Sequence, residues 1–201
     1  MDIVKFGVLA TFTEQALGTT PYDEDIAKTY VIGKNPAGPQ ADELAAGNWN
    51  PDEVLEKAST GFPRNPVTGQ PIIFDYQLKG MFKDATGMLN RSKSKEQQMK
   101  AYKKVIDGLI FPEPRMMDIE MNGEMEWCIR SIRVDTPQGP RVAIARSEAV
   151  PAGSTFKFDV VLLDPKLKKH VLELLDYGKY RGLLQWRNSG KGRFTYELTD
   201  A

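Results

Sequence analysis

The residues best suited to chemistry lie near the carboxy-terminal end, where glycines, cationic side chains and aromatic rings alternate between Tyr177 and Phe194. Glycine lets a backbone approach a partner closely, arginine and lysine contact phosphates, and aromatic rings stack on bases. We therefore interpret the stretch as a surface for RNA or single-stranded DNA, whose bases are splayed out. The residues that would bind are Tyr180, Arg181, Trp186, Arg187, Gly190, Lys191, Gly192 and Arg193.

The same stretch is also compatible with a purely structural role. A tight turn before a closing strand would have the same composition, with Trp186 buried in the core. A nucleotide-binding loop of the GxxxxGK[ST] type is excluded, because it needs a strand before it, a helix after it and a serine or threonine after the lysine. Here Lys191 is followed by Gly192, and the glycines lie between a predicted helix and a predicted strand.

Candidates for catalysis are few. Asp23 and Asp25, in TTPYDEDI, are typical by themselves of a solvated acidic turn or the start of a helix. The single histidine, His170, lies among lysines on a predicted helix and is expected on the surface or in packing. The single cysteine, Cys128, excludes an internal disulfide and is expected to be a buried thiol. We expect no cofactor, no metal site, and binding rather than catalysis.

The distribution of charge is more informative than the net charge, which is zero. Nine acidic residues against two lysines lie between Glu14 and Glu56. Eight cationic residues against two acids lie between Lys79 and Lys104, and again between Lys166 and Arg193. A neutral protein with such segments can still present one positive face, although each run is also typical of a solvated helix surface.

The elements that must position these residues follow from apolar periodicity and turn residues. Phe156, Phe158, Val160 and Leu162 alternate on one face of the best strand, and Leu167, Val171, Leu174 and Leu175 form the stripe of the next helix. Asn122-Gly123 predicts a tight hairpin. The predicted strands are 2–13, 115–121, 126–134, 141–147, 154–163 and 193–199, and the predicted helices are 22–31, 40–46, one starting at Asn50-Pro51, 90–107, and one from Asp164-Pro165 to Gly178.

This order of elements predicts a single α+β domain over residues 1–201, with an irregular insertion at about 17–62 after the first strand. We expect an antiparallel sheet with helices on one face and a ferredoxin-like β-α-β-β-α-β core.

Several segments resemble the RAMP superfamily, the ferredoxin-like RNA-binding subunits of CRISPR effector complexes. PAGSTFKF at 151–158, the helix LKKHVLELLDYG and the turn RGLLQWRNSGKGRF are similar to the family's carboxy-terminal region. PIIFDYQLKGMFK at 71–83 is similar to an element of type III backbone subunits. The resemblance implies RNA binding through Gly190–Arg193 and through Lys79, Gly80 and Lys83. Bulky Leu183 and Leu184 depart from the family pattern, and residues 110–149 match none of it.

We therefore expect a cytoplasmic RNA-binding or single-strand-binding subunit of a CRISPR-type ribonucleoprotein, whose partners include other protein subunits or copies of itself. No apolar run reaches the ~20 residues of a membrane helix, so no membrane partner is expected. Two alternatives stay open. One is implied by the resemblance, because some RAMP subunits cleave RNA with an aspartate in the loop after the first strand. It is an endoribonuclease that uses Asp23 or Asp25 of the corresponding region to orient a 2′-hydroxyl or to hold a metal ion. The other is a phage-encoded RAMP-like protein that contacts or inhibits a host complex through its acidic insertion.

Overall fold

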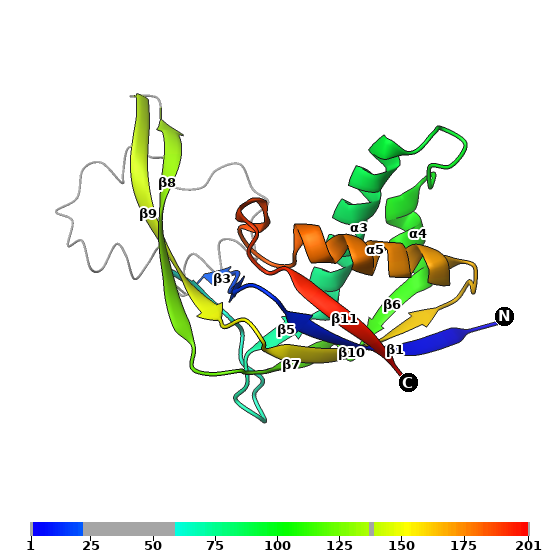
Figure 1. Cartoon of the computed structure of the whole chain (residues 1–201), viewed down its shortest axis with the longest axis horizontal. Helices are drawn as coiled ribbons and strands as arrows, with labels where there is room; N and C mark the ends of the chain where they lie inside the picture. The colour runs from blue at the N-terminus through cyan, green and yellow to red at the C-terminus, as the bar shows by residue number, and fades with distance from the viewer. Residues whose placement is uncertain (1, 22–58, 137–138, 201) are drawn as a thin grey trace.

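The computed structural model describes residues 2–21, 59–136 and 139–200 (Figure 1). The fold is α+β and ferredoxin-like. A six-stranded antiparallel sheet carries helices on one face, and a second, five-stranded sheet adjoins it. The predicted helices 22–31, 40–46 and the one starting at Asn50 lie outside the described residues.

The core sheet has the strand order of a ferredoxin-like domain. β6 and β7 both pair with β10, so they act as one interrupted strand, and every pairing in this sheet is antiparallel. The chain order of strand, helix, two strands, helix and strand is the predicted one. The neighbours across the sheet are β11 (Phe194–Thr199), β1 (Val4–Phe12), β10 (Thr155–Leu162), β7 (Met116–Glu120) with β6 (Ile110–Glu113), and β5 (Ile72–Phe74).

Three helices of the described part cover one face of this sheet: α3 (Asp75–Ser92), α4 (Tyr102–Leu109) and α5 (Leu167–Arg181). The alternation predicted for β10 is confirmed, since Phe156, Phe158, Val160 and Leu162 are all buried. The stripe predicted for α5 is also buried, at Leu167, Val171, Leu174 and Leu175. Burial of these apolar faces against each other drives the two layers together.

The helix predicted over 90–107 is wrong, because α3 ends at Ser92 and α4 begins at Tyr102. The side-chain amide of Asn90 donates to the Met99 carbonyl and accepts from the Met99 N–H, both at 3.1 Å. This pair closes the connection between the helices. The apolar spacing continues through the break because Met99, Tyr102 and Ile106 all reach the same core.

The end of α5 also differs from the prediction. The helix does not stop at Gly178 but continues to Arg181, with Gly182 as its cap at φ +78°. Gly178 lies inside the helix because the ring of Phe194 packs against it. A Cβ at position 178 would lie 2.3 Å from Cζ of that ring.

The second sheet is built on a long hairpin of β8 (Glu126–Thr136) and β9 (Gly139–Val150), which projects from the core (Figure 1). We call this hairpin the arm. The ends of the predicted insertion join the same sheet: β9 pairs with β2 (Ala16–Leu17) and with β4 (Ser59–Gly61), and β4 pairs with β3 (Thr20–Pro21).

The hairpin predicted at Asn122-Gly123 is wrong, because β7 pairs with β10 and β5 while β8 pairs with β9. The Asn122 N–H donates to the Ser154 hydroxyl at 2.9 Å, and its side chain donates to the Ala152 carbonyl at 3.1 Å. Asn122 therefore holds the turn before β10, and the chain passes there from one sheet to the other.

No helix in the described ranges is both long enough and apolar enough to span a membrane.

Candidate nucleic-acid interface

The stretch between α5 and β11, residues 182–193, is here called the glycine-rich loop. It contains a short 3-10 turn, Arg187–Ser189. Leu183 N–H donates to the Gly192 carbonyl, and Gly192 N–H donates to the Gln15 carbonyl, both at 2.8 Å. Gly192 has φ +69°, and a Cβ there would lie 2.0 Å from the Leu183 oxygen. Glycine at 192 therefore lets the beginning and the end of the loop come into contact. The sequence had suggested that the glycines serve the close approach of a nucleic acid to the backbone.

Leu183 and Leu184, the two bulky residues that depart from the RAMP pattern, lie in different environments. Leu183 is 1% exposed and belongs to the hydrophobic core, so it anchors the loop. Leu184 has φ +68° and is half-buried. A leucine in this left-handed region is strained, so contacts on both sides of it must hold the loop in this shape.

Gln185 supplies such contacts by joining the loop to the second sheet. Its side-chain nitrogen donates to the Gly18 carbonyl at 2.6 Å and to the Thr60 hydroxyl at 3.0 Å. Its side-chain oxygen accepts from Arg130 Nη2 on β8 at 2.8 Å. Three hydrogen bonds of one side chain therefore tie the loop to the ends of the predicted insertion, at Gly18 and Thr60, and to the arm, at Arg130.

Trp186 is not sealed inside the protein. It is 36% exposed and has φ +55°. The guanidinium of Arg130 lies 4.5 Å from the centroid of its ring, a cation–π contact. Arg130 also donates to Ser147 at 3.3 Å, which fixes its position over the indole. The structure thus presents a partly exposed aromatic ring that is held in place from the arm.

Two arginines of this region converge on one carboxylate of α3. Arg181 Nε and Arg187 Nη1 lie 3.1 and 3.0 Å from the same oxygen, Oδ2 of Asp84. Arg181 also donates to the side-chain oxygen of Asn188. Asp84 and both arginines are less than one third exposed, so water screens these ion pairs less than it screens pairs on the open surface.

The other two cations of the loop have neutral partners. Lys191 Nζ donates to the side-chain oxygen of Gln15 and Arg193 Nε donates to the Tyr180 carbonyl, each at 2.9 Å. Within the described ranges neither of them has a carboxylate partner. Among the described residues the four cations therefore have one carboxylate partner in all, Asp84, which pairs with Arg181 and Arg187, and this region keeps a positive charge.

A cavity of about 340 Å³ lies in the middle of this arrangement. One wall is the indole of Trp186, and the cationic walls are the two arginines that share Asp84. A hollow lined by an aromatic ring and guanidinium groups can take a planar ring and an anion side by side. The lining residues are Arg181, Leu184, Trp186, Arg187 and Asn188.

Tyr180, at the end of α5, is 74% exposed and open to stacking. Gly190 has φ +81°, and a Cβ there would lie 3.3 Å from the Arg193 guanidinium carbon. Tyr180 therefore lies at the surface at the end of α5, and Gly190 is half-buried against the Arg193 side chain in the loop.

The lysines predicted on α3 are turned toward α4 and β6. Lys83 Nζ lies 2.6 Å from Oδ1 of Asp107, and Lys79 Nζ donates to the Asp107 carbonyl and lies 4.4 Å from the Phe111 ring centroid. Five residues turn a helix by about 140°, so Lys79 and Asp84 face different ways. The structure therefore brings α3 to the glycine-rich loop through Asp84, not through the lysines. Gly80 is exposed, and no atom lies within 4 Å of a Cβ built there.

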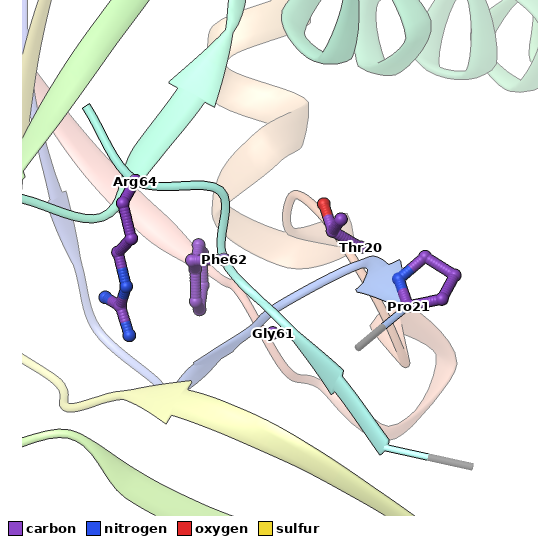
Figure 2. Close-up of a pocket in the computed structure, with 5 residues that line it drawn as sticks. All are labelled: Thr20, Pro21, Gly61, Phe62 and Arg64. Atoms are coloured by element: carbon purple, nitrogen blue, oxygen red, sulfur yellow. The ribbon is translucent and has the colours of Figure 1, made fainter. Parts of the chain in front are cut away.

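A second cavity, of about 350 Å³, lies between the ends of the predicted insertion (Figure 2). Its lining residues are Thr20, Pro21, Gly61, Phe62 and Arg64. Arg64 Nη2 lies 2.6 Å from the carboxylate of Glu148, which is 5% exposed and also accepts the Phe62 N–H at 2.8 Å. The one arginine of this cavity is thus committed to a buried carboxylate.

His170 takes part in packing between helices. Its Nε2 lies 3.1 Å from the hydroxyl of Thr86, and its Nδ1 lies 3.4 Å from Glu173, which also pairs with Lys93 at 2.7 Å. Burial lowers the pKa of His170, and the hydrogen bond from Lys93 lowers the pKa of Glu173. Thr86 is fully buried and the His170 side chain is 13% exposed, so the histidine is a packing residue between α3 and α5.

The remaining candidates add no site. Asp23 and Asp25 lie outside the described residues. Cys128 is half-buried, so it is less enclosed than the sequence suggested. In the part of the chain that the structure covers, no group of three or more histidine, cysteine, aspartate or glutamate residues could hold a metal ion.

No protein-family model matches the chain, and no curated protein matches it. Among solved structures, it is similar to a chain of "Cryo-EM structure of the Type III-B Cmr-beta bound to cognate target RNA", with a TM-score of 0.56 and 12% identity. That match covers 98% of this chain and 61% of the other, so this chain spans about three fifths of its neighbour's length. It is also similar to a chain of "Type IV-B CRISPR Complex", with a TM-score of 0.49, 11% identity, and coverage of 98% and 90%. The chain therefore shares its fold with a chain of the type III-B Cmr-beta structure.

Sequence reasoning missed three residues that organise the interface: Asp84, Gln185 and Arg130. Each acts on a partner more than 50 residues away along the chain. Asp84 is one of two acids in the segment from Lys79 to Lys104, where eight cationic residues dominate the charge.

Proposed function

We propose that this protein binds single-stranded nucleic acid, RNA first of all, through the glycine-rich loop, as a subunit of a CRISPR-type ribonucleoprotein. The observation that carries the proposal is the partly exposed Trp186, held under the Arg130 guanidinium beside four cations. Among the described residues these cations have only one carboxylate partner, Asp84, which Arg181 and Arg187 share. The fold supports the proposal that the protein is a subunit of a ribonucleoprotein, because it is shared with a chain of a structure bound to cognate target RNA.

In this proposal the phosphates contact the cations of the loop, and a base stacks on an aromatic ring. Arg193 and Lys191 are the most available, because neither has a carboxylate partner among the described residues. Trp186 is the better stacking platform, since its ring is fixed from one side, and Tyr180 is the second one. Stacking on an aromatic ring contributes about 1–3 kcal/mol per base and tolerates any sequence.

Lys79, Gly80 and Lys83 form a separate part of the proposal. These residues can contribute only if the bound nucleic acid continues past α3 toward α4, where Lys83 pairs with Asp107. The endoribonuclease alternative depends on Asp23 and Asp25, and the alternative of a phage-encoded interacting protein depends on the acidic insertion. Both stay predictions.

The test is the binding of a fluorescently labelled 12-nucleotide RNA, followed by anisotropy over a series of salt concentrations. Each phosphate contact on a single strand contributes about 0.7 to the slope of log affinity against log salt. The double variant Lys191→Ala, Arg193→Ala should therefore weaken binding and lower that slope by about 1.4.

The matched control is Lys103→Ala, Lys104→Ala, which removes the same charge from exposed positions on α4 that have no ion pair with any described residue. This control should keep nearly the affinity and slope of the unmodified protein. The proposal fails if the RNA affinity does not depend on salt, or if the loop variant and the control behave alike.

A further inference from the structure

We propose that the cavity beside Trp186 holds one nucleotide of the bound nucleic acid, and that in the unbound protein the Asp84 carboxylate takes the role of that nucleotide's phosphate. This inference rests on the proposed function and deepens it. It makes Asp84 an internal counter-anion, which keeps Arg181 and Arg187 together and lowers the affinity that they would otherwise give.

The convergence of the two arginines is the first observation. Arg181 and Arg187 come from the end of α5 and from the 3-10 turn, yet both reach Oδ2 of Asp84, at 3.1 and 3.0 Å. Two guanidinium groups repel each other unless an anion lies between them. A carboxylate oxygen that accepts from two guanidinium groups resembles an oxygen of a bound phosphate in charge and in hydrogen bonding.

The composition of the cavity is the second observation. Both arginines line it, together with the indole of Trp186 and the Asn188 side chain, and its volume is about 340 Å³. A phosphate at the arginines and a base on the indole are the two parts of a nucleotide, and the cavity presents both surfaces at once. The ligand class is therefore a nucleotide unit within a single strand.

The third observation is that the ion pairs with Asp84 leave further N–H donors on both arginines. Arg187 contacts the carboxylate through Nη1, and Arg181 contacts it through Nε while its Nη1 donates to Asn188. A guanidinium has five N–H donors, so each arginine can donate to Asp84 and to a phosphate together. Binding does not require the ion pairs to break, but the negative charge of Asp84 opposes the incoming phosphate.

The alternative is that Asp84 only fastens the glycine-rich loop to α3. The variant Asp84→Asn distinguishes the fastening role from the counter-anion role, because it keeps an oxygen that accepts hydrogen bonds and removes the charge. A fastening role predicts equal or weaker RNA binding in this variant. The counter-anion role predicts about fivefold tighter binding at low salt. This is the size expected when the negative charge of Asp84, about 6 Å from the RNA phosphate, is removed from a site that water partly screens.

The experiment measures the affinity of the 12-nucleotide RNA for the full chain. Asp84→Asn should bind about fivefold more tightly and should increase the salt slope by about 0.7, one phosphate contact. Glu197→Gln is the matched control, since it removes one acidic charge at an exposed position on β11. It should change the affinity less than twofold. In Arg187→Ala the gain from Asp84→Asn should be largely lost.

A second variant covers the case in which Asp84→Asn does not fold. Asn188→Asp adds a carboxylate to the same cavity at an exposed position, and it should weaken RNA binding about fivefold. The inference is overturned if Asp84→Asn folds and binds no more tightly, or if Asn188→Asp binds as well as the unmodified protein. If Lys191→Ala, Arg193→Ala still weakens binding in those cases, the proposed function stands and only the role of Asp84 falls. If the unmodified chain binds no RNA, the proposed function itself falls.

Discussion

Gly178 offers a test in which two effects of opposite sign compete. In a helix interior, replacing glycine by alanine normally stabilises a protein by about 1 kcal/mol, because glycine is more flexible in the unfolded chain. In this structure the new Cβ would lie 2.3 Å from Cζ and 2.6 Å from Cε1 of Phe194. Forcing an extra methyl group into a packed core costs about 1–3 kcal/mol.

The clash should win at this position because the Phe194 ring has no room to move. The ring is fully buried, and it meets Phe156 edge-on with centroids 6.4 Å apart. We expect Gly178→Ala to lose about 1–2 kcal/mol of unfolding free energy, the upper part of the overpacking cost less the gain in propensity. With a urea m-value of about 2 kcal/mol/M, the unfolding midpoint should fall by roughly 0.5–1 M.

Gly80→Ala is the matched control, since Gly80 also lies inside a helix but has no atom within 4 Å of the new Cβ. It should raise the unfolding free energy by about 0.5–1 kcal/mol. Gly178→Ala combined with Phe194→Leu should be less destabilised than the sum of its parts, by about 1 kcal/mol. Urea unfolding in which Gly178→Ala and Gly80→Ala are equally stable would refute this account of the packing between α5 and β11.

Three further predictions concern buried polar groups. Glu148→Ala should cost about 2–4 kcal/mol in urea unfolding, because it leaves the Phe62 N–H and the Arg64 guanidinium without this carboxylate; an unchanged midpoint would contradict the role of the pair. Burial lowers the pKa of His170 below 6.5, so the unfolded chain binds its proton first, and stability should fall as the pH drops below about 6.5. In His170→Gln the fall between pH 7 and 5.5 should be smaller, and an equal fall would assign it to other groups. Gln185→Ala should cost about 1–3 kcal/mol and should increase hydrogen exchange at the glycine-rich loop, and a loop as protected as before would show that this side chain does not hold it.

The ferredoxin-like core could be predicted because its signals are local. The alternation in β10 and the stripe on α5 each reflect one buried face, and a buried face leaves its period in the sequence. The same reasoning failed at Asn122-Gly123 because a turn dipeptide reports local backbone shape and not the strands that pair on either side. Asn122 bonds instead to the turn at 152–154, some 30 residues away.

The candidate site could be predicted in part. Its cations and Trp186 stand out because glycine, arginine and aromatic residues gather in one short stretch. The groups that position them do not stand out, since Asp84 and Arg130 are ordinary surface residue types in helix and strand segments. Only the folded chain shows that one acid serves two arginines, and that the arm supplies the guanidinium over the indole.

The place at which the arm leaves the core makes the length of the arm independent of the core sheet. Glu120, the last residue of β7, pairs with Thr155, the first residue of β10, so the chain departs and returns at adjacent points. The outer part of this hairpin, beyond the paired residues Arg130 and Ala145, could change in length without altering any pairing among β1, β6, β7, β10 and β11, or the pairing of β9 with β2 and β4. Arms of other lengths would therefore leave both the ferredoxin-like scaffold and the contact of Arg130 with Trp186 unchanged, while the reach of the protein on this side is varied.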